Sequence, residues 1–185
     1  MALGATVYKA TVDISDLDRP YYGRHVLTIA RHPSETEERL MLRLLAFCRH
    51  ADEHTEFGRG LSTEGEPALW QIDDTGVIAE WIDVGWPDVK QVRKAAGRSD
   101  RVVIITYDEA KYEPWWQSNR GDFGKIDKLT VLAVDDEFVG PLASLADRNM
   151  RLAVTIQDDI AWISDDKRSV EVRFKLLQQA RDTYN

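Results

Sequence analysis

The chain has 185 residues and a mass of 21.2 kDa, a size typical of one domain, so we treat residues 1–185 as a single unit. Hydrophobic residues make up 43% of the chain, which is enough for a core and excludes disordered, collagen-like and disulfide-stapled classes. With 24 basic and 32 acidic residues, the formal net charge of −8 argues against strong nonspecific binding to nucleic acid.

The cysteine and hydropathy patterns indicate a cytoplasmic protein. Cys48 is the single cysteine and cannot form an internal disulfide, and the four histidines are too dispersed for zinc-ligand spacing. No stretch approaches the ~20 apolar residues of a membrane span. The opening residues, MALGATVYKA, lack a basic start followed by an apolar run. We therefore expect no membrane association.

The first half of the chain predicts a hairpin, a helix and a second hairpin. Residues 6–14 and 25–30 alternate apolar and polar positions on either side of a break at 18–20. Ser34 and Glu37 have the spacing of a capping box, which predicts a helix over 34–51. The second hairpin lies within 67–85 and turns at Asp74, Thr75 and Gly76.

The second half predicts alternating helices and buried strands. A short helix follows Pro87 and closes at Gly97. Residues 101–107 are apolar on both faces, as in a strand covered by helices on each side. The remaining expected elements are a strand at 128–134, helices at 108–118 and 138–147, a hairpin at 152–163 and a strand at 170–174. This order predicts a mixed α/β fold, a mixed sheet flanked by helices with accessory hairpins.

Carboxylates are the strongest candidates for chemistry, since the sequence lacks the GxxxxGK[ST], GxGxxG, HExxH and GxSxG motifs. On a helical wheel the apolar arc of the 34–51 helix also encloses Glu37 and Glu38. The cap explains Glu37. An inward Glu38 needs a cation, a proton or a metal, and a structural salt bridge to an Arg is the alternative.

Two further acids lie on the second hairpin. Asp83 ends an inward row in WIDVG and needs a partner or an ion, whereas Asp74 lies at the turn, where simple turn formation is the alternative. A helix acid and two strand acids can converge on one Mg²⁺, which polarises a phosphoryl oxygen and activates water. Lys90 and Lys94 follow Asp83 one helical turn apart and can orient that water, although both lie opposite the apolar stripe of their helix.

Several stretches resemble the bacterial YaeQ family across nearly the whole chain. They are RHPSETEERLMLRLLAF, EPALWQIDD, WIDVGWPD, RKAAG, the pair Trp115 and Trp116, and VTIQDD. The resemblance implies a compact, restriction-endonuclease-like variant of the PD-(D/E)XK nuclease fold. In that fold, a helix and three strands carry a divalent-metal site.

The resemblance also implies roles for individual residues. Glu38 would be the acid of the first core helix, while Asp74 and Asp83 would hold Mg²⁺, or Mn²⁺ in its place. Asp73 stands where the motif has Pro, and Gly85 stands where it has Lys. The catalytic Lys would then come from the next helix, with Lys94 as first choice and Lys90 as second.

The leading hypothesis is a metal-dependent nuclease or phosphodiesterase of unspecified substrate, with catalytic residues Glu38, Asp74, Asp83 and Lys94. Its rival is a nuclease-like scaffold without turnover that binds nucleic acid or protein. A third alternative is a structural carboxylate cluster. Trp115 and Trp116 can stack on bases or wedge a helix against the core, and the latter is the commoner case. We expect a monomer, with nucleic acid as the implied partner.

Overall fold

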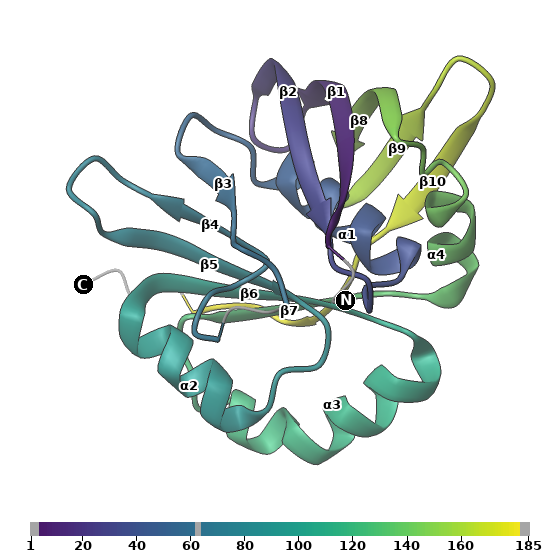
Figure 1. Ribbon diagram of the computed structural model, residues 1–185. Coiled ribbons are helices and arrows are strands. Elements are labelled where there is room, and N and C mark those ends of the chain that lie inside the picture. The colour runs from purple at the N-terminus through teal and green to yellow at the C-terminus, as the bar shows by residue number, and fades with distance from the viewer. Residues whose placement is uncertain (1–3, 62–63, 182–185) are drawn as a thin grey trace.

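The computed structural model describes residues 4–61 and 64–181, which form two mixed sheets and four helices (Figure 1). The first sheet has the order β10-β9-β8-β1-β2. β1 pairs with β8 in parallel, and the other neighbours are antiparallel. Its strands are β1 (Thr6–Asp16), β2 (Tyr21–Arg31), β8 (Asn149–Gln157), β9 (Ile160–Ser164) and β10 (Ser169–Arg173).

The second sheet has the order β11-β7-β6-β5-β4-β3, and its centre is parallel. β5, β6 and β7 run parallel to one another, whereas β3, β4 and β11 pair antiparallel with their neighbours. The strands are β3 (Thr55–Phe57), β4 (Leu69–Ile72), β5 (Ile78–Val84), β6 (Ser99–Tyr107), β7 (Leu129–Val134) and β11 (Lys175–Gln178). The helices are α1 (Glu37–Arg49), α2 (Val89–Arg98), α3 (Glu109–Phe123) and α4 (Asp136–Ala143).

Two hydrophobic clusters lie on the two faces of the second sheet. The larger cluster joins the inner face of the first sheet to α1, α4 and the second sheet. α1 is its centre, with every residue from Leu40 to Cys48 buried. The smaller cluster, which includes Trp81 and Phe123, lies on the face of the second sheet that α2 and α3 cover in Figure 1. Burial raises the pKa of the Cys48 thiol to about 12, as expected for an inert core cysteine.

The mixed α/β class is confirmed, and each predicted helix and strand is present with shifted ends. The sequence predicted one sheet, but the structure has two. The first hairpin, β1 and β2, pairs with the later hairpin, β8 and β9, through the parallel contact of β1 with β8, and these strands form a sheet of their own. β3 and β11 were not predicted, since short polar strands carry little periodicity. Trp115 and Trp116 pack against the smaller cluster, in agreement with the wedge interpretation.

Local boundaries differ at two helices. α1 begins at Glu37, and Thr36 caps it by accepting a hydrogen bond from the Arg39 amide, so Ser34 and Glu37 form no capping box. α2 continues through Gly97 to Arg98, where the chain passes directly into β6. Among the described residues, no helix is both long and apolar enough to cross a bilayer.

Candidate functional site

A pocket of about 840 Å³ lies at the carboxyl ends of β5 and β6. In open sheets with parallel strands, ligands bind outside these ends of the strands. We call it the carboxyl-end pocket. It is lined by Ser34, Glu35, Thr36, Arg39, Leu61, Glu64, Gly65, Glu66, Trp81, Asp83, Val84, Gly85, Trp86, Pro87, Asp88, Lys90, Gln91, Lys94, Ala95, Arg98, Tyr107 and Lys111.

Asp83 is the carboxylate that β5 brings into this pocket. The indole Nε1 of Trp81 donates to its Oδ2 at 3.0 Å, and the Ala68 amide donates to its Oδ1 at 3.3 Å. Burial raises the pKa of Asp83, and these hydrogen bonds with the charge of Arg39 offset only part of that effect. No Lys or Arg of the described residues forms an ion pair with it. Asp83 is therefore a half-buried acid held by neutral donors.

Arg98 fixes the indole that holds Asp83. Its guanidinium lies 5.0 Å from the centre of the Trp81 ring, and its Nη1 donates to the Gly65 carbonyl at 2.7 Å. These contacts join α2 to the loop before β4. The position of the Asp83 carboxylate thus depends on α2 as well as on its own strand.

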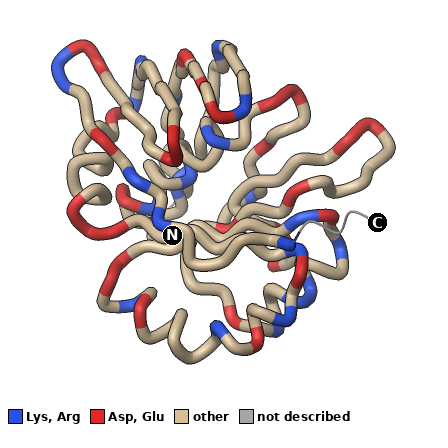
Figure 2. Tube along the Cα trace, turned by 180° about the vertical axis from the view of Figure 1, so that it is seen from behind, with Lys and Arg blue, Asp and Glu red and all other residues tan. Residues whose placement is uncertain are grey.

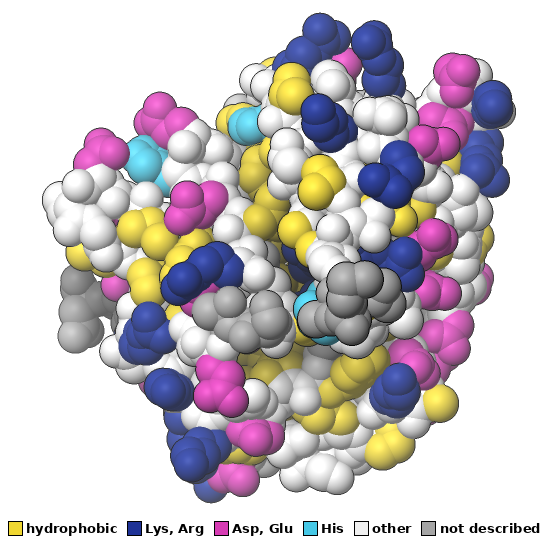
Figure 3. Space-filling model, viewed as in Figure 1, with side chains coloured by type: hydrophobic (Ala, Val, Ile, Leu, Met, Phe, Trp, Pro, Cys, Tyr) yellow, Lys and Arg dark blue, Asp and Glu magenta, His cyan; other side chains and the backbone are white. Residues whose placement is uncertain are grey.

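A cationic stripe lines the rim of the pocket along α2. Lys90, Lys94 and Arg98 follow one another at intervals of four residues and so share one face of the helix. Val92 and Ala95 are buried. Figure 3 shows Lys and Arg side chains gathered over α2. Figure 2 shows that many acidic positions lie in turns in other parts of the chain. The lysines do face away from the core, as the wheel indicated, and this direction brings them to the pocket that holds Asp83.

A buried acid of the pocket is Glu35, which the sequence analysis did not single out. It is only 3% exposed, and Arg43 donates to its two carboxylate oxygens at 2.6 and 2.9 Å. Arg39 forms a further ion pair with it. The spacing of Glu35, Arg39 and Arg43 at intervals of four was a signal for this network. Two guanidinium groups therefore compensate Glu35.

Glu38 is exposed, so the prediction that it faces inward is wrong. The wheel treats all turns of a helix as equally covered. The first turn of α1 precedes the buried segment that begins at Leu40, and only that segment packs between the sheets. Glu38 does not line the pocket.

The structure does not bring Asp74 to Asp83. Asp74 lies at the turn between β4 and β5 with its side chain 96% exposed, 3.3 Å from His54. Asp83 lies five residues beyond Ile78, the start of β5, which corresponds to about 16 Å along the strand. One ion cannot contact both carboxylates, whose separation is far above the reach of a coordination shell.

The carboxylates near Asp83 do not fit the expected magnesium site. Glu35 is bound by arginines, and Glu66 forms an ion pair with Arg59 at 2.7 Å. The described residues contain no group of three or more His, Cys, Asp or Glu that could hold a metal ion. Asp83 thus has no cluster of further ligands around it among the described residues.

The backbone at Gly85 favours glycine. Its φ is +138°, a conformation that residues with a side chain rarely adopt, and its amide donates to the Ile105 carbonyl at 3.0 Å. A lysine here would strain the end of β5. The lysines that line this pocket are Lys90 and Lys94 on α2 and Lys111 on α3.

The comparisons place the chain among proteins called YaeQ. The profile of the family described as "YaeQ protein" matches residues 1–174. Over 179 residues, 97% of this chain and 99% of the relative, it is 45% identical to "Uncharacterized protein YaeQ" of Escherichia coli (strain K12). The relative of the same description from Salmonella typhi is 42% identical over the same shares of both chains.

Two solved structures are similar throughout. The crystal structure of the YaeQ protein from Xanthomonas axonopodis pv. citri has a TM-score of 0.91 and 46% identity, covering 94% of this chain and 98% of that chain. The YaeQ protein from Pseudomonas syringae has a TM-score of 0.89 and 33% identity, covering 95% and 97%. The two-sheet arrangement is thus common to these proteins.

Proposed function

The chain belongs to the YaeQ family, and on that premise we propose that its carboxyl-end pocket binds the phosphate backbone of a nucleic acid. The fold would resemble that of a nuclease, but the proposed binding would not require metal-assisted hydrolysis. The observation that carries the proposal is the stripe of Lys90, Lys94 and Arg98 along the rim. The order α1, β3, β4, β5, α2, β6 supports it, since it supplies the helix and three strands that the PD-(D/E)XK resemblance requires.

Charge pairing inside the pocket favours an anionic ligand. Glu35 and Glu66 are neutralised by arginines, and Asp88 caps α2 by accepting from the Gln91 amide. Lys90 and Lys94 form no ion pair with a described residue. These two lysines of the rim therefore have no carboxylate partner among the described residues, although the net charge of the chain is −8.

Measuring how the affinity for oligonucleotides depends on salt concentration tests this proposal. We would measure fluorescence anisotropy of single-stranded and duplex probes with wild type and a Lys90→Gln/Lys94→Gln variant. Each lost phosphate contact lowers the slope of log K against log salt by about 0.7–0.9, so we expect a decrease of roughly 1.5. The matched control is Lys9→Gln/Lys167→Gln on the first sheet, where both lysines are exposed. Equal slopes in wild type and both variants would refute the proposal.

A second candidate function is metal-dependent phosphodiester hydrolysis. The observation in its favour is that Asp83 is half-buried, lacks a cationic partner and shares its pocket with Lys94. In this case Asp83 would be the ligand of Mg²⁺ or Mn²⁺. The described residues contain no group of three or more His, Cys, Asp or Glu that could hold a metal ion, which makes hydrolysis the weaker candidate.

Mn²⁺ titration with a bound oligonucleotide separates the two functions. Hydrolysis requires saturable Mn²⁺ binding and cleavage, both lost in Asp83→Asn. Glu38→Gln and Asp74→Asn serve as controls, since both side chains are exposed and outside the pocket. Oligonucleotide binding without Mn²⁺ binding or cleavage would support the binding function and refute hydrolysis. Loss of Mn²⁺ binding in Asp74→Asn would contradict the separation of Asp74 from Asp83 described above.

A further inference from the structure

A second pocket, of about 690 Å³, lies at the opposite, amino ends of β5, β6 and β7. We call it the amino-end pocket. It is bounded by the end of α1, the three strand starts, the chain after β11 and the turn between β8 and β9. The pocket therefore lies where both sheets and α1 meet, and none of the residues of the carboxyl-end pocket line it.

A histidine and a glutamate form the polar centre of the amino-end pocket. His50 Nδ1 lies 2.9 Å from Oε2 of Glu80, although the residues are 30 positions apart in the chain. Burial alone raises the pKa of Glu80, but the hydrogen bond from His50 and the charges of His50 and Arg101 outweigh it and lower the pKa. An ionised carboxylate only accepts hydrogen bonds, so Nδ1 must be the donor.

The other ring nitrogen of His50 lacks a hydrogen-bond partner. Nε2 is buried with no partner among the described residues. It offers a lone pair when the ring is neutral with its proton on Nδ1, and a proton when the ring is charged. A buried polar atom without a partner requires an explanation. The Glu80 carboxylate orients the ring through Nδ1. His50 can therefore pair through Nε2 with a group in the pocket that both donates and accepts.

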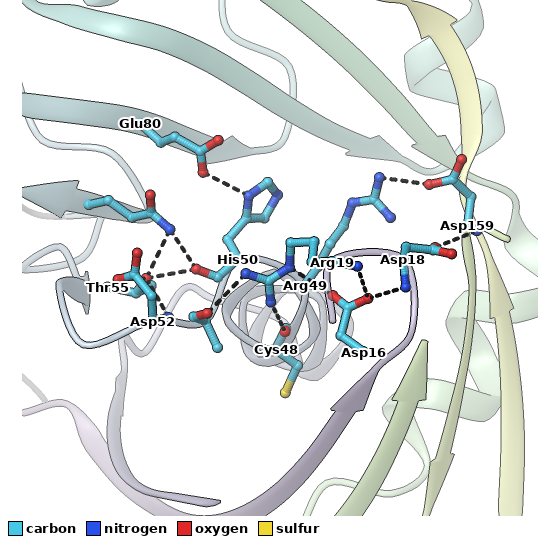
Figure 4. Close-up of polar contacts among 12 residues, drawn as sticks. Asp16, Asp18, Arg19, Cys48, Arg49, His50, Asp52, Thr55, Glu80 and Asp159 are labelled. Atoms are coloured by element: carbon cyan, nitrogen blue, oxygen red, sulfur yellow. Dashed lines mark hydrogen bonds and ion pairs between the residues drawn. The ribbon is translucent and has the colours of Figure 1, made fainter. Parts of the chain in front are cut away.

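The side chains around His50 form a rigid frame. Figure 4 shows His50 and Arg49 leaving the same end of α1, with Arg49 reaching toward Asp159 in the turn between β8 and β9. Their ion pair measures 2.8 Å, and Arg49 also lies 4.7 Å from the centre of the Phe174 ring. Arg19 donates to the carbonyls of Cys48 and Ala51 and closes the helix end.

The charged side chains that line the amino-end pocket are balanced in number and largely paired with groups beside them. Four carboxylates and four Lys or Arg side chains line it. Arg49 pairs with Asp159, Arg181 pairs with Asp127 at 3.1 Å, and the Lys128 ammonium donates to two backbone carbonyls. Val103, Leu132 and Leu176 add an apolar wall. This lining favours a neutral ligand rich in groups that both donate and accept.

We propose that the amino-end pocket binds a neutral polyhydroxylated molecule through a hydroxyl group that forms a hydrogen bond with His50 Nε2. A sugar hydroxyl donates one hydrogen bond and accepts others, so it can also accept from the surrounding Arg and Lys side chains. The carbon face of a sugar ring suits the apolar wall. The shared chemistry is that of a ribose ring, which a free sugar or a nucleoside can supply.

Titration of D-ribose and adenosine, followed by ¹⁵N NMR of the histidine rings, tests the proposal. We expect saturable binding of adenosine, of ribose or of both, with a shift of the His50 Nε2 signal. Binding of ribose as well as adenosine indicates recognition of the sugar alone, and binding of adenosine alone indicates a nucleoside. 2′,3′-Dideoxyadenosine, which lacks the vicinal hydroxyls, should bind at least tenfold more weakly than adenosine.

A matched pair of variants locates the contact. His50→Asn keeps a side-chain N–H toward Glu80 and removes Nε2, so binding should weaken at least tenfold. His54→Asn is the control, since His54 pairs with Asp74 outside the pocket. The NMR shift in wild type provides the same test should His50→Asn fail to fold. Absence of saturable binding by both ligands, equal binding by the dideoxy analogue, or unchanged binding in His50→Asn would overturn the proposal.

Discussion

Glu80 and Asp83 lie three residues apart on β5 and have opposite electrostatic environments. An odd separation puts them on opposite faces of the strand. Glu80 faces α1, where His50 donates to it and its pKa is lowered. Asp83 is held by Trp81 and Ala68 under α2, and its pKa is raised. Two acids on one strand thus have pKa values shifted in opposite directions. The partners that other elements bring to each carboxylate decide the direction of the shift.

The two pockets at the ends of this sheet differ in the same way. In the carboxyl-end pocket Glu35 and Glu66 pair with arginines, while Asp83 and the α2 lysines have no ion pair with a described residue; the amino-end pocket pairs most of its charges internally. The net charge of −8 predicts neither arrangement. Local pairing determines which ligand each pocket favours.

The largest expected effect on stability comes from removing the charge of Glu35, the buried acid that two arginines compensate. Glu35→Gln removes the negative charge from Arg43, which is 2% exposed, and an unpaired buried charge costs about 3–5 kcal/mol. Urea denaturation should report this loss in the free energy of unfolding. Glu38→Gln is the control and should change it by less than about 0.5 kcal/mol. Similar small changes in both variants would contradict the role of Glu35 as the buried partner.

A smaller loss is expected at the end of β5. Gly85→Ala places a side chain at φ +138°, which costs about 1–3 kcal/mol in a backbone that the Ile105 hydrogen bond holds in place. Thermal unfolding should show a lower Tm. Gly97→Ala in α2 should instead be neutral or stabilising, since its φ is ordinary and no atom crowds the added carbon. A Gly85→Ala protein as stable as wild type would show that the backbone does not require glycine there.

Glu80→Gln should destabilise the protein in a pH-dependent manner. The folded pKa of Glu80 lies below its ordinary value of 4.5, so the ionised group stabilises the fold above that pH. This contribution disappears as the pH falls through the folded pKa. The difference in unfolding free energy between wild type and variant should therefore be largest near pH 7 and decrease below about 4.5. A difference independent of pH would contradict the ionised pair.

Asp83→Asn should show the opposite sign and the smallest effect. The folded pKa of Asp83 lies above its ordinary value of 3.8, so the wild type loses stability as the pH rises from 3.8 through the folded pKa. The variant has no such titration. Urea denaturation between pH 3.5 and 7 should show wild type losing stability relative to Asp83→Asn as the pH increases. A relative gain would mean that Asp83 has a cationic partner when folded.

Much of the fold could be predicted from local patterns. The apolar runs of β6 and β7, the alternating β1 and β2, and the apolar helix α1 each follow from residues adjacent in sequence. Asp83 was correctly assigned to an inward position, because the period of two along a strand determines its face. The family resemblance was confirmed over residues 1–174.

The sequence by itself determined most element types, the α/β class and the face of strand residues such as Asp83, since these depend on local periodicity. Tertiary structure alone decided the division into two sheets, the exposure of Glu38 and the contact between His50 and Glu80. It also separated Asp74 from Asp83, because the length of β5 lies between them. Burial and ion pairing depend on groups distant in the chain, and no pattern within one element specifies which distant group arrives.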